Sequence, residues 1–241
     1  FGGILDMAMQ WEVFGVGRQL ATAVLVAGLA GACAQPQTTG LVGDHAATQA
    51  EAEAQQAFLM SEYTEANTRL QGVAAEVAFA NASECGSKVI PRFGFVASSA
   101  VNFEEKWRPL ARRTGLIANV PVVKRVALNG PSSGLIEPGD ALLSVNGQPL
   151  GDPETESTRI SEAGTSGEGR FQVRRNSEVK EVRILAEPAC AFPVALDWAN
   201  AGNAYTDGEK IVVSRGMMDL AKTDDELALV LSHELAHIAS G

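Results

Sequence analysis

The sequence has 241 residues, of which 46% are hydrophobic and 20% charged, so one large or two small domains can each bury a core. Its net charge of −10 and pI of about 4.8 argue against a general nucleic-acid-binding protein, because such a protein needs a basic face to neutralise phosphates. The chain begins at Phe1 and ends at Gly241 within a helix-like pattern, so we expect a fragment of a longer protein.

Residues 1–32 have the features of a signal peptide. Arg18 precedes the apolar run Leu20–Ala32, which is shorter than the roughly 20 residues that span a bilayer. The segment Leu29-Ala30-Gly31-Ala32-Cys33 resembles the lipobox of bacterial lipoproteins. That resemblance implies cleavage before Cys33, lipidation of its thiol and a membrane-anchored lipoprotein facing the periplasm. The alternative is a plain secretion signal with an incidental cysteine.

The two other cysteines lie far apart, at Cys85 and Cys190. In an oxidising compartment they can pair, and the bridge would close a loop of roughly 100 residues. Two buried free thiols are the alternative. Because CxxC spacing is absent, a cysteine-based zinc site is not expected.

Residues 33–43 are polar and contain Gly and Pro, which suits a short tether. A long amphipathic helix is predicted over 44–84, with Asp44 as its N-cap. Its larger apolar residues recur at steps of four and three, which predicts packing on a core or, alternatively, a coiled-coil partner; they are Leu59, Tyr63, Ala66, Leu70, Val73 and Val77.

Residues 85–190 change to short β-type runs separated by Gly and Pro. Helices are predicted over Glu104–Arg113 and Pro153–Ala163. Strands are predicted over Val122–Leu128, Ala141–Val145, Phe171–Arg174 and Val179–Leu185, the last two as a hairpin around Asn176-Ser177.

The stretch Val122–Leu150 resembles the centre of a PDZ domain. Gly134-Leu135, Gly139-Asp140 and Asn146-Gly147 stand at the matching points, although the segment before Gly134 is short for the family. Arg92-Phe93-Gly94-Phe95 resembles the PDZ loop that binds a peptide's terminal carboxylate, and Gly115-Leu116-Ile117 is a rival for that role. The resemblance is equally compatible with a PDZ domain that serves only as a spacer.

The last segment contains the pattern His233-Glu234-Leu235-Ala236-His237, an HExxH motif. Thr223 and Glu226 form a capping box that predicts a helix start just before it. Residues four apart share a helix face, so His233 and His237 can both bind Zn²⁺, while Glu234 can accept a proton from water as the catalytic base. The alternative is a half-exposed helix with incidental histidines.

Residues Val194–Gly241 resemble the zinc peptidase family of the CAAX prenyl protease and its bacterial lipoprotein members, in which a PDZ domain also occurs. The resemblance rests on NAYTDGEKIVVSRGMMDL (203–220) and DELALVLSHELAH (225–237). It implies that Asn203 and Ala204 lie on an edge strand that pairs with an extended substrate, Asn203 having the alternative role of a turn residue. It also implies a third zinc ligand, a glutamate on a later helix, which this chain does not reach.

The sequence therefore predicts an α+β protein in which residues 191–241 begin a zinc metalloendopeptidase domain with Zn²⁺ as cofactor. The implied substrates are polypeptides, namely misfolded or unassembled proteins of the bacterial cell envelope. Two rivals stand beside this interpretation. A site-2-type intramembrane protease is disfavoured because Asp224, Asp225 and Glu226 crowd the helix start. A lipid-anchored PDZ peptide-binding module with an incomplete peptidase domain is the other.

Overall fold

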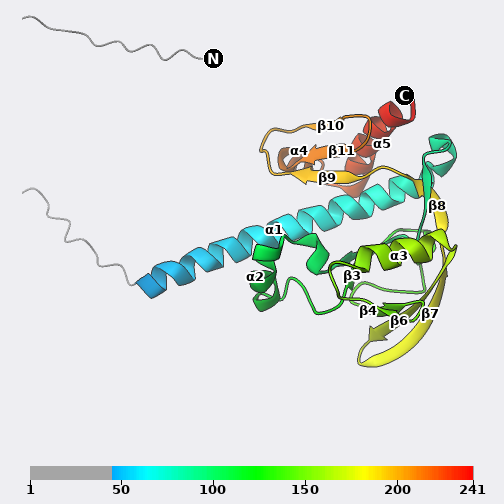
Figure 1. Ribbon diagram of the computed structural model, residues 1–241. Coiled ribbons are helices and arrows are strands. Elements are labelled where there is room, and N and C mark those ends of the chain that lie inside the picture. Colours follow the sequence, from blue (N-terminus) through cyan, green and yellow to red (C-terminus); the bar gives the residue numbers. More distant parts are fainter. Residues whose placement is uncertain (1–44, 241) are drawn as a thin grey trace, which may run out of the picture. The chain divides into compact units, whose positions relative to one another are not determined.

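The computed structural model describes residues 45–240, and within them helices are combined with mainly antiparallel sheets, which confirms the α+β prediction (Figure 1). The predictions for residues 1–32, for the tether over 33–43 and for Cys33 lie outside the described residues. None of the described helices combines the length and the apolar character that crossing a bilayer demands.

Helix α1 runs over His45–Ala80, shorter at its C-terminal end than the predicted 44–84, because a 3-10 turn, η1 (Ala82–Cys85), replaces its last residues. The apolar stripe is buried only in the C-terminal half, where Leu70, Val73 and Val77 are nearly inaccessible. In the N-terminal half Leu59 and Tyr63 remain 50% and 38% exposed. The prediction that this helix packs on a core is confirmed for the C-terminal part of the stripe, while Tyr63 contacts Trp198 at its partly exposed side.

The largest sheet has the strand order β2-β3-β4-β6-β7, with the short β5 beside β4. Its strands are β2 (Phe95–Ser98), β3 (Val122–Val126), β4 (Ala141–Val145), β5 (Gln148–Pro149), β6 (Glu168–Arg175) and β7 (Glu178–Leu185). Two positive-φ pairs, Asn146-Gly147 and Asn176-Ser177, form the tight turns β4–β5 and β6–β7, as left-handed backbone at both positions favours hairpins. The predicted hairpin is confirmed.

Short helices accompany this sheet. They are η2 (Ala100–Asn102), η3 (Glu105–Trp107), α2 (Arg108–Arg113) and α3 (Glu156–Thr165). Helix α3 begins three residues later than predicted, because Asp152 forms a turn by accepting from the backbone of Glu154 and from the Thr155 hydroxyl. The core under the sheet centres on Phe171, which is fully buried and meets Phe93 and Phe95 edge-on.

Asp140 follows the predicted Gly139 turn and is 1% exposed. Two nitrogens of Arg175 donate to its carboxylate at 2.7 and 2.6 Å, and the backbone N–H of Glu137 donates at 2.9 Å. Burial alone would raise the pKa of Asp140, but these hydrogen bonds and the Arg175 charge bring that pKa below its usual value. A satisfied buried ion pair thus fixes this corner of the sheet.

Strands β1 (Val89–Arg92) and β8 (Glu187–Cys190) pair antiparallel, and Val89 lies opposite Cys190. Cys85 and Cys190, the pair predicted from the sequence, form a disulfide with Cα atoms 5.6 Å apart. The ends of the 85–190 segment therefore lie together, as the predicted bridge requires.

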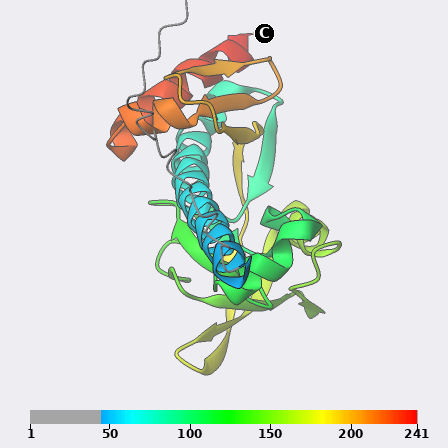
Figure 2. The same cartoon turned by 90° about the vertical axis from the view of Figure 1, so that its left-hand side faces the viewer.

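A three-stranded sheet follows, in the order β10-β11-β9. Its elements are β9 (Val194–Asp197), β10 (Ala204–Thr206) and β11 (Ile211–Ser214), followed by α4 (Arg215–Leu220) and α5 (Asp224–Ser240). The buried side chains of these elements form one core with the C-terminal half of α1. Helix α1 contacts α5 and β9 as well as β2 and β3, so it touches both sheets (Figures 1 and 2).

Candidate metallopeptidase site

Helix α5 holds the HExxH motif and is anchored by its buried leucines. Thr223 and Glu226 form the predicted capping box, since each backbone N–H donates to the other's side chain, at 2.9 and 3.2 Å. Leu227 and Leu231 are fully buried in the shared core. This apolar stripe leaves the opposite face, with His233 and His237, exposed.

The two histidines lie next to each other on that exposed face. Their Nε2 atoms are 3.3 Å apart and their rings meet edge to face, with centroids at 4.9 Å. Two ligands that bind one tetrahedral Zn²⁺ at about 2.0–2.1 Å stand about 3.3–3.4 Å apart. The separation therefore fits a shared zinc ion without rearrangement. The same separation also permits a hydrogen bond between the two Nε2 atoms when one ring is protonated at Nε2 and the other is not. This hydrogen bond is the alternative interpretation for the metal-free protein.

Glu234 lies one residue on from His233 and is 9% exposed. Among residues 46–240, no side chain or backbone donor forms a hydrogen bond or ion pair with its carboxylate. A mostly enclosed carboxylate without a hydrogen-bonding partner is available to accept a proton. Over the same part of the chain, no group of three or more His, Cys, Asp or Glu side chains is close enough to hold a metal ion.

Strand β10 forms the edge of the three-stranded sheet and contacts α5. Its first residue, Ala204, packs against the core, while Asn203 just before it is exposed. The backbone N–H of Asn203 donates to Ser214 Oγ at 2.9 Å, and its carbonyl accepts from the Ser214 N–H at 2.9 Å. Within residues 46–240 the Asn203 side chain has no hydrogen-bonding partner, and the outer edge of β10 pairs with no other strand, the arrangement that β-strand addition uses.

Sequence reasoning missed the part that Ser214 plays here. Its hydroxyl also accepts from the Met217 N–H and donates to the Ala201 carbonyl, so one side chain caps α4 and fixes the entry to β10. A serine directly before an apolar helical run was the available signal.

A second concave surface, with a volume of about 510 Å³, lies between β2 and α3 and is walled on one side by α1. Its lining includes Arg92, Phe93, Gly94 and Phe95, the predicted carboxylate-binding loop, and excludes the rival Gly115-Leu116-Ile117. Gly94 has φ +77, and an added Cβ would press on Phe79 and Pro131 at 3.0 and 3.1 Å. The loop's conformation thus requires glycine.

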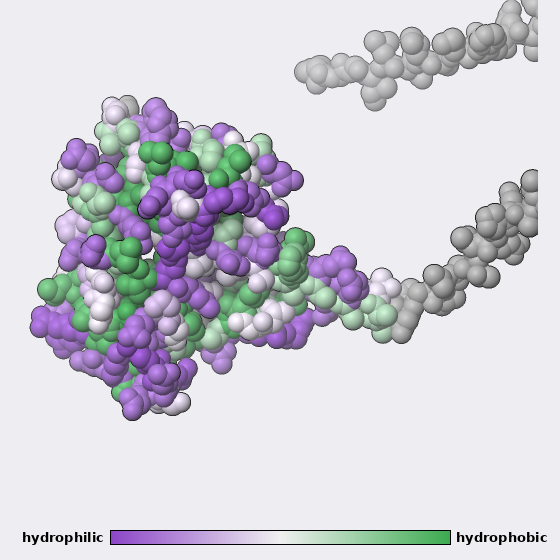
Figure 3. Space-filling view, turned by 180° about the vertical axis from the view of Figure 1, so that it is seen from behind, coloured by the Kyte–Doolittle hydropathy of each residue, from purple (hydrophilic) through white to green (hydrophobic). Residues whose placement is uncertain are grey.

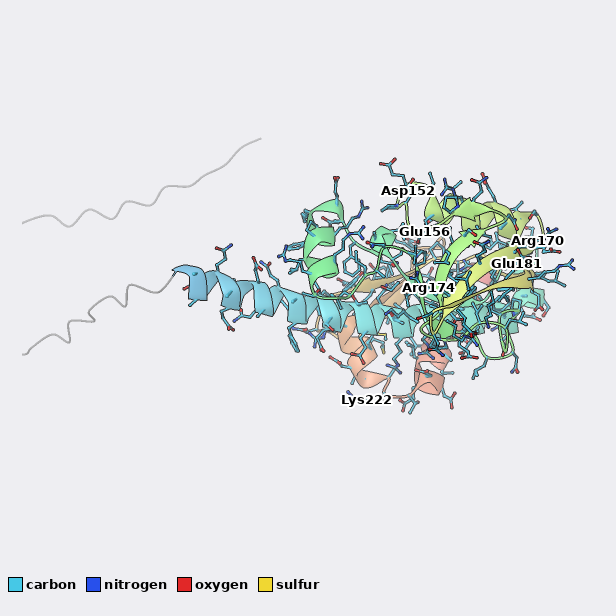
Figure 4. All side chains as sticks on the ribbon, turned by 90° about the horizontal axis from the view of Figure 1, so that it is seen from below. Asp152, Glu156, Arg170, Arg174, Glu181 and Lys222 are labelled. Atoms are coloured by element: carbon cyan, nitrogen blue, oxygen red, sulfur yellow. A yellow bond between two sulfur atoms is a disulfide. The ribbon has the colours of Figure 1, made fainter. Side chains whose placement is uncertain are left out.

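Two ionisable groups in this groove are perturbed by burial. The Nε of Arg92 is enclosed and lacks a hydrogen-bond partner among the described residues, and burial lowers the pKa of its guanidinium. Burial raises the pKa of Glu156, which is 4% exposed and accepts a 2.6 Å hydrogen bond from Ser99. Figure 4 labels Glu156 and Asp152 near the start of α3. The Arg92 guanidinium forms no ion pair with any of residues 46–240, which suits an anionic ligand group.

Comparison with known protein families finds a match to the segment that contains helix α5. Residues 177–241 match Peptidase family M48. The match begins within the β6–β7 hairpin, ahead of the predicted boundary at 191, and contains β10 and the HExxH helix. It supports a zinc metallopeptidase family and a peptidase role for this segment.

Two curated relatives also match, each at 31% identity over 87 residues. They are the Magnetosome formation protease MamE of Magnetospirillum gryphiswaldense and of Paramagnetospirillum magneticum. The match covers 34% of this chain but 11% and 12% of the relatives, so the chain spans about a tenth of their length. Both relatives are described as proteases.

Solved structures of PDZ-containing and HtrA-type proteins are similar to part of the chain. The HtrA3 PDZ domain bound to a phage-derived ligand is 24% identical, with a TM-score of 0.32, over 42% of this chain and 88% of that one. The HtrA-type protease AlgW with a decapeptide is 19% identical, with a TM-score of 0.31, over 42% and 30% of the respective chains.

Proposed function

We propose that this protein is a zinc-dependent metalloendopeptidase that hydrolyses polypeptides, with His233 and His237 as zinc ligands and Glu234 as the catalytic base. The supporting observation is the pair of Nε2 atoms 3.3 Å apart, on a helix that also carries the buried Glu234 and contacts the edge strand β10. Catalytic zinc sites have three protein ligands, so the proposal requires one ligand besides the two histidines.

The chain's own groups have separate tasks in this proposal. Zinc, when bound, would polarise the scissile carbonyl and lower the pKa of a water molecule. Glu234 accepts the proton of that water and returns it to the leaving amine. The free edge of β10, with Asn203 and Ala204, holds the substrate extended by main-chain hydrogen bonds.

The test compares two substitutions in the full-length protein. Glu234→Gln keeps both imidazoles, so zinc should stay bound while the rate of peptide hydrolysis falls about 10²–10⁴-fold. His237→Ala removes a ligand, so zinc and activity should be lost together. Asp225→Asn, a carboxyl-to-amide change at an exposed site on the same helix, and His45→Ala are the matched controls and should retain both. Zinc retained in His237→Ala would contradict the ligand assignment.

We further propose that the protein is a lipoprotein of the bacterial envelope, anchored through Cys33, and that it removes misfolded or unassembled envelope proteins. The support is the lipobox-like sequence before Cys33, together with the disulfide, which favours an oxidising compartment. Mass spectrometry of the mature N-terminus should find a diacylated or triacylated Cys33. An unmodified Cys33, or cleavage elsewhere, would leave a protein without this anchor.

The groove between β2 and α3 favours a second function, which is peptide binding by a PDZ-like module. The observation behind it is the enclosed, unpartnered Nε of Arg92 in the groove lining. A library of fluorescent peptides with free C-termini should contain binders whose affinity falls on C-terminal amidation and in Arg92→Gln. Equal affinity for free and amidated peptides would exclude carboxylate recognition.

A further inference from the structure

The first turn of α5 is connected to both neighbouring elements by arginines. Asp224, at the first position of the helix, accepts from Arg69 Nε of α1 at 2.8 Å and from Arg125 Nη2 of β3 at 2.7 Å. Its carboxylate thus bridges α1 and the six-stranded sheet. These two hydrogen bonds, led by the one from Arg125, lower the pKa of Asp224.

Arg69 also holds the segment that leads into Asp224. Its Nη2 donates to the Thr223 carbonyl at 2.6 Å and its Nη1 to the Met218 carbonyl at 3.4 Å. At the other end of the helix, Lys88 Nζ donates to the Ile238 carbonyl at 2.9 Å. Helix α5 is therefore held by directional contacts at both ends, with the histidines between them.

The path of Arg125 depends on a glycine in the neighbouring helix. Gly72 lies in the interior of α1, where glycine is the least favourable residue after proline. A Cβ added there would stand 2.4 Å from Arg125 Nε and 2.5 Å from its Cδ. Gly72 thus leaves the space through which Arg125 reaches Asp224, which explains its presence in an otherwise regular helix.

These contacts matter for a metal site because apolar packing is not directional. Leu227 and Leu231 hold α5 against the core, but the hydrophobic effect follows the buried area and does not by itself select one rotation about the helix axis. A rotation of about 10° moves an atom about 6 Å from the axis by about 1 Å. Catalytic groups must be placed within about 0.5 Å, so the orientation of α5 needs directional contacts.

We propose that Asp224, held by Arg69 and Arg125 in the space left by Gly72, is a positioning residue that sets the orientation of the motif helix. The proposal rests on the proposed peptidase function for its catalytic consequence, but the ordering of α5 can be measured without turnover. Arg125 lies opposite Val96 of β2, so its backbone is fixed by the sheet.

The experiment measures amide hydrogen exchange over residues 224–238 and, in parallel, kcat and KM for a peptide substrate in the full-length protein. Arg125→Gln should speed exchange across the first two turns of α5 roughly five- to tenfold, since it removes a partly exposed charged hydrogen bond. It should lower kcat with KM unchanged, without a matching fall in the unfolding temperature. Asp224→Asn should have the same effects, and Asp224→Glu should restore part of the loss.

Arg170→Gln is the matched control, because it removes an exposed ion pair with Glu168 from the same sheet. Figure 4 labels Arg170 well apart from Lys222, which precedes α5. This variant should leave the exchange of α5 and kcat unchanged.

Gly72→Ala separates positioning from a purely structural role. Alanine favours the helix, so the unfolding temperature should not fall, whereas displacement of Arg125 should still speed exchange in α5. Exchange in α5 that is the same in Arg125→Gln and Arg170→Gln would overturn the proposal. So would a uniform loss of protection along the whole chain. Absence of peptide hydrolysis by the wild type would count against the proposed function alone.

Discussion

The disulfide gives the prediction with the largest magnitude. Cys85 and Cys190 are separated by 105 residues, and cross-linking ends so far apart lowers the entropy of the unfolded chain by an amount worth about 4–5 kcal/mol. Replacing both with serine should lower the free energy of unfolding by that order. The loss should be seen as a lower urea midpoint under non-reducing conditions.

The double substitution should also destabilise the C-terminal end of α5, because Lys88, which follows the bridged Cys85 in the sequence, donates a hydrogen bond to the Ile238 carbonyl. Cys33→Ser is the matched control and should leave the midpoint unchanged. The wild type in reducing buffer should behave like the double variant. A loss below about 1 kcal/mol, or a free thiol at Cys85 or Cys190 in the oxidised wild type, would refute the reasoning.

Two further substitutions test the packing that supports the site. Asp140→Asn should cost about 1–3 kcal/mol, because Arg175 loses a buried charged acceptor but keeps its ion pair with Glu137. Since the folded-state pKa of Asp140 is lowered, its contribution to the free energy of unfolding should be complete above its unfolded pKa of about 3.9 and should vanish as the pH falls through the folded value. Urea midpoints measured from pH 7 to pH 2 will show this loss in the wild type. The same fall of the midpoint at low pH in the Asp140→Asn variant would contradict the prediction. Leu231→Ala should lower the free energy of unfolding by about 2–5 kcal/mol, because Leu231 is fully buried. The control Leu229→Ala, at a site 73% exposed, should change it by no more than about 0.5 kcal/mol in thermal unfolding. Equal losses in the two variants would contradict the assigned faces of α5.

The elements that the sequence predicted well are those whose signals are local. Thr223 and Glu226 define a capping box by spacing alone, and the structure shows both of its hydrogen bonds. Asn176-Ser177 between two alternating runs predicted the β6–β7 hairpin for the same reason. The His233 and His237 pairing follows from helix geometry, which needs no tertiary information.

The parts that could not be predicted depend on contacts between distant segments. The heptad-like pattern of α1 is continuous from Leu59 to Val77, but burial of its first half depends on whether another element reaches it. Nothing near Arg69, Arg125 or Asp224 in the sequence indicates that they meet, because they are separated by up to 155 positions. Figure 3 shows hydrophilic and hydrophobic residues intermixed over one face, so surface composition alone marks no site there.

The most direct test of the central claim is zinc content measured together with peptide hydrolysis in full-length wild-type protein and in Glu234→Gln. Both proteins should contain one zinc ion per chain, and only the wild type should cleave an unfolded polypeptide such as casein at an appreciable rate, with the variant about 10²–10⁴-fold slower. A zinc-loaded Glu234→Gln protein that cleaves casein as fast as the wild type would contradict the role of Glu234. A wild type that holds no zinc and cleaves nothing would contradict the enzyme and leave the peptide-binding module.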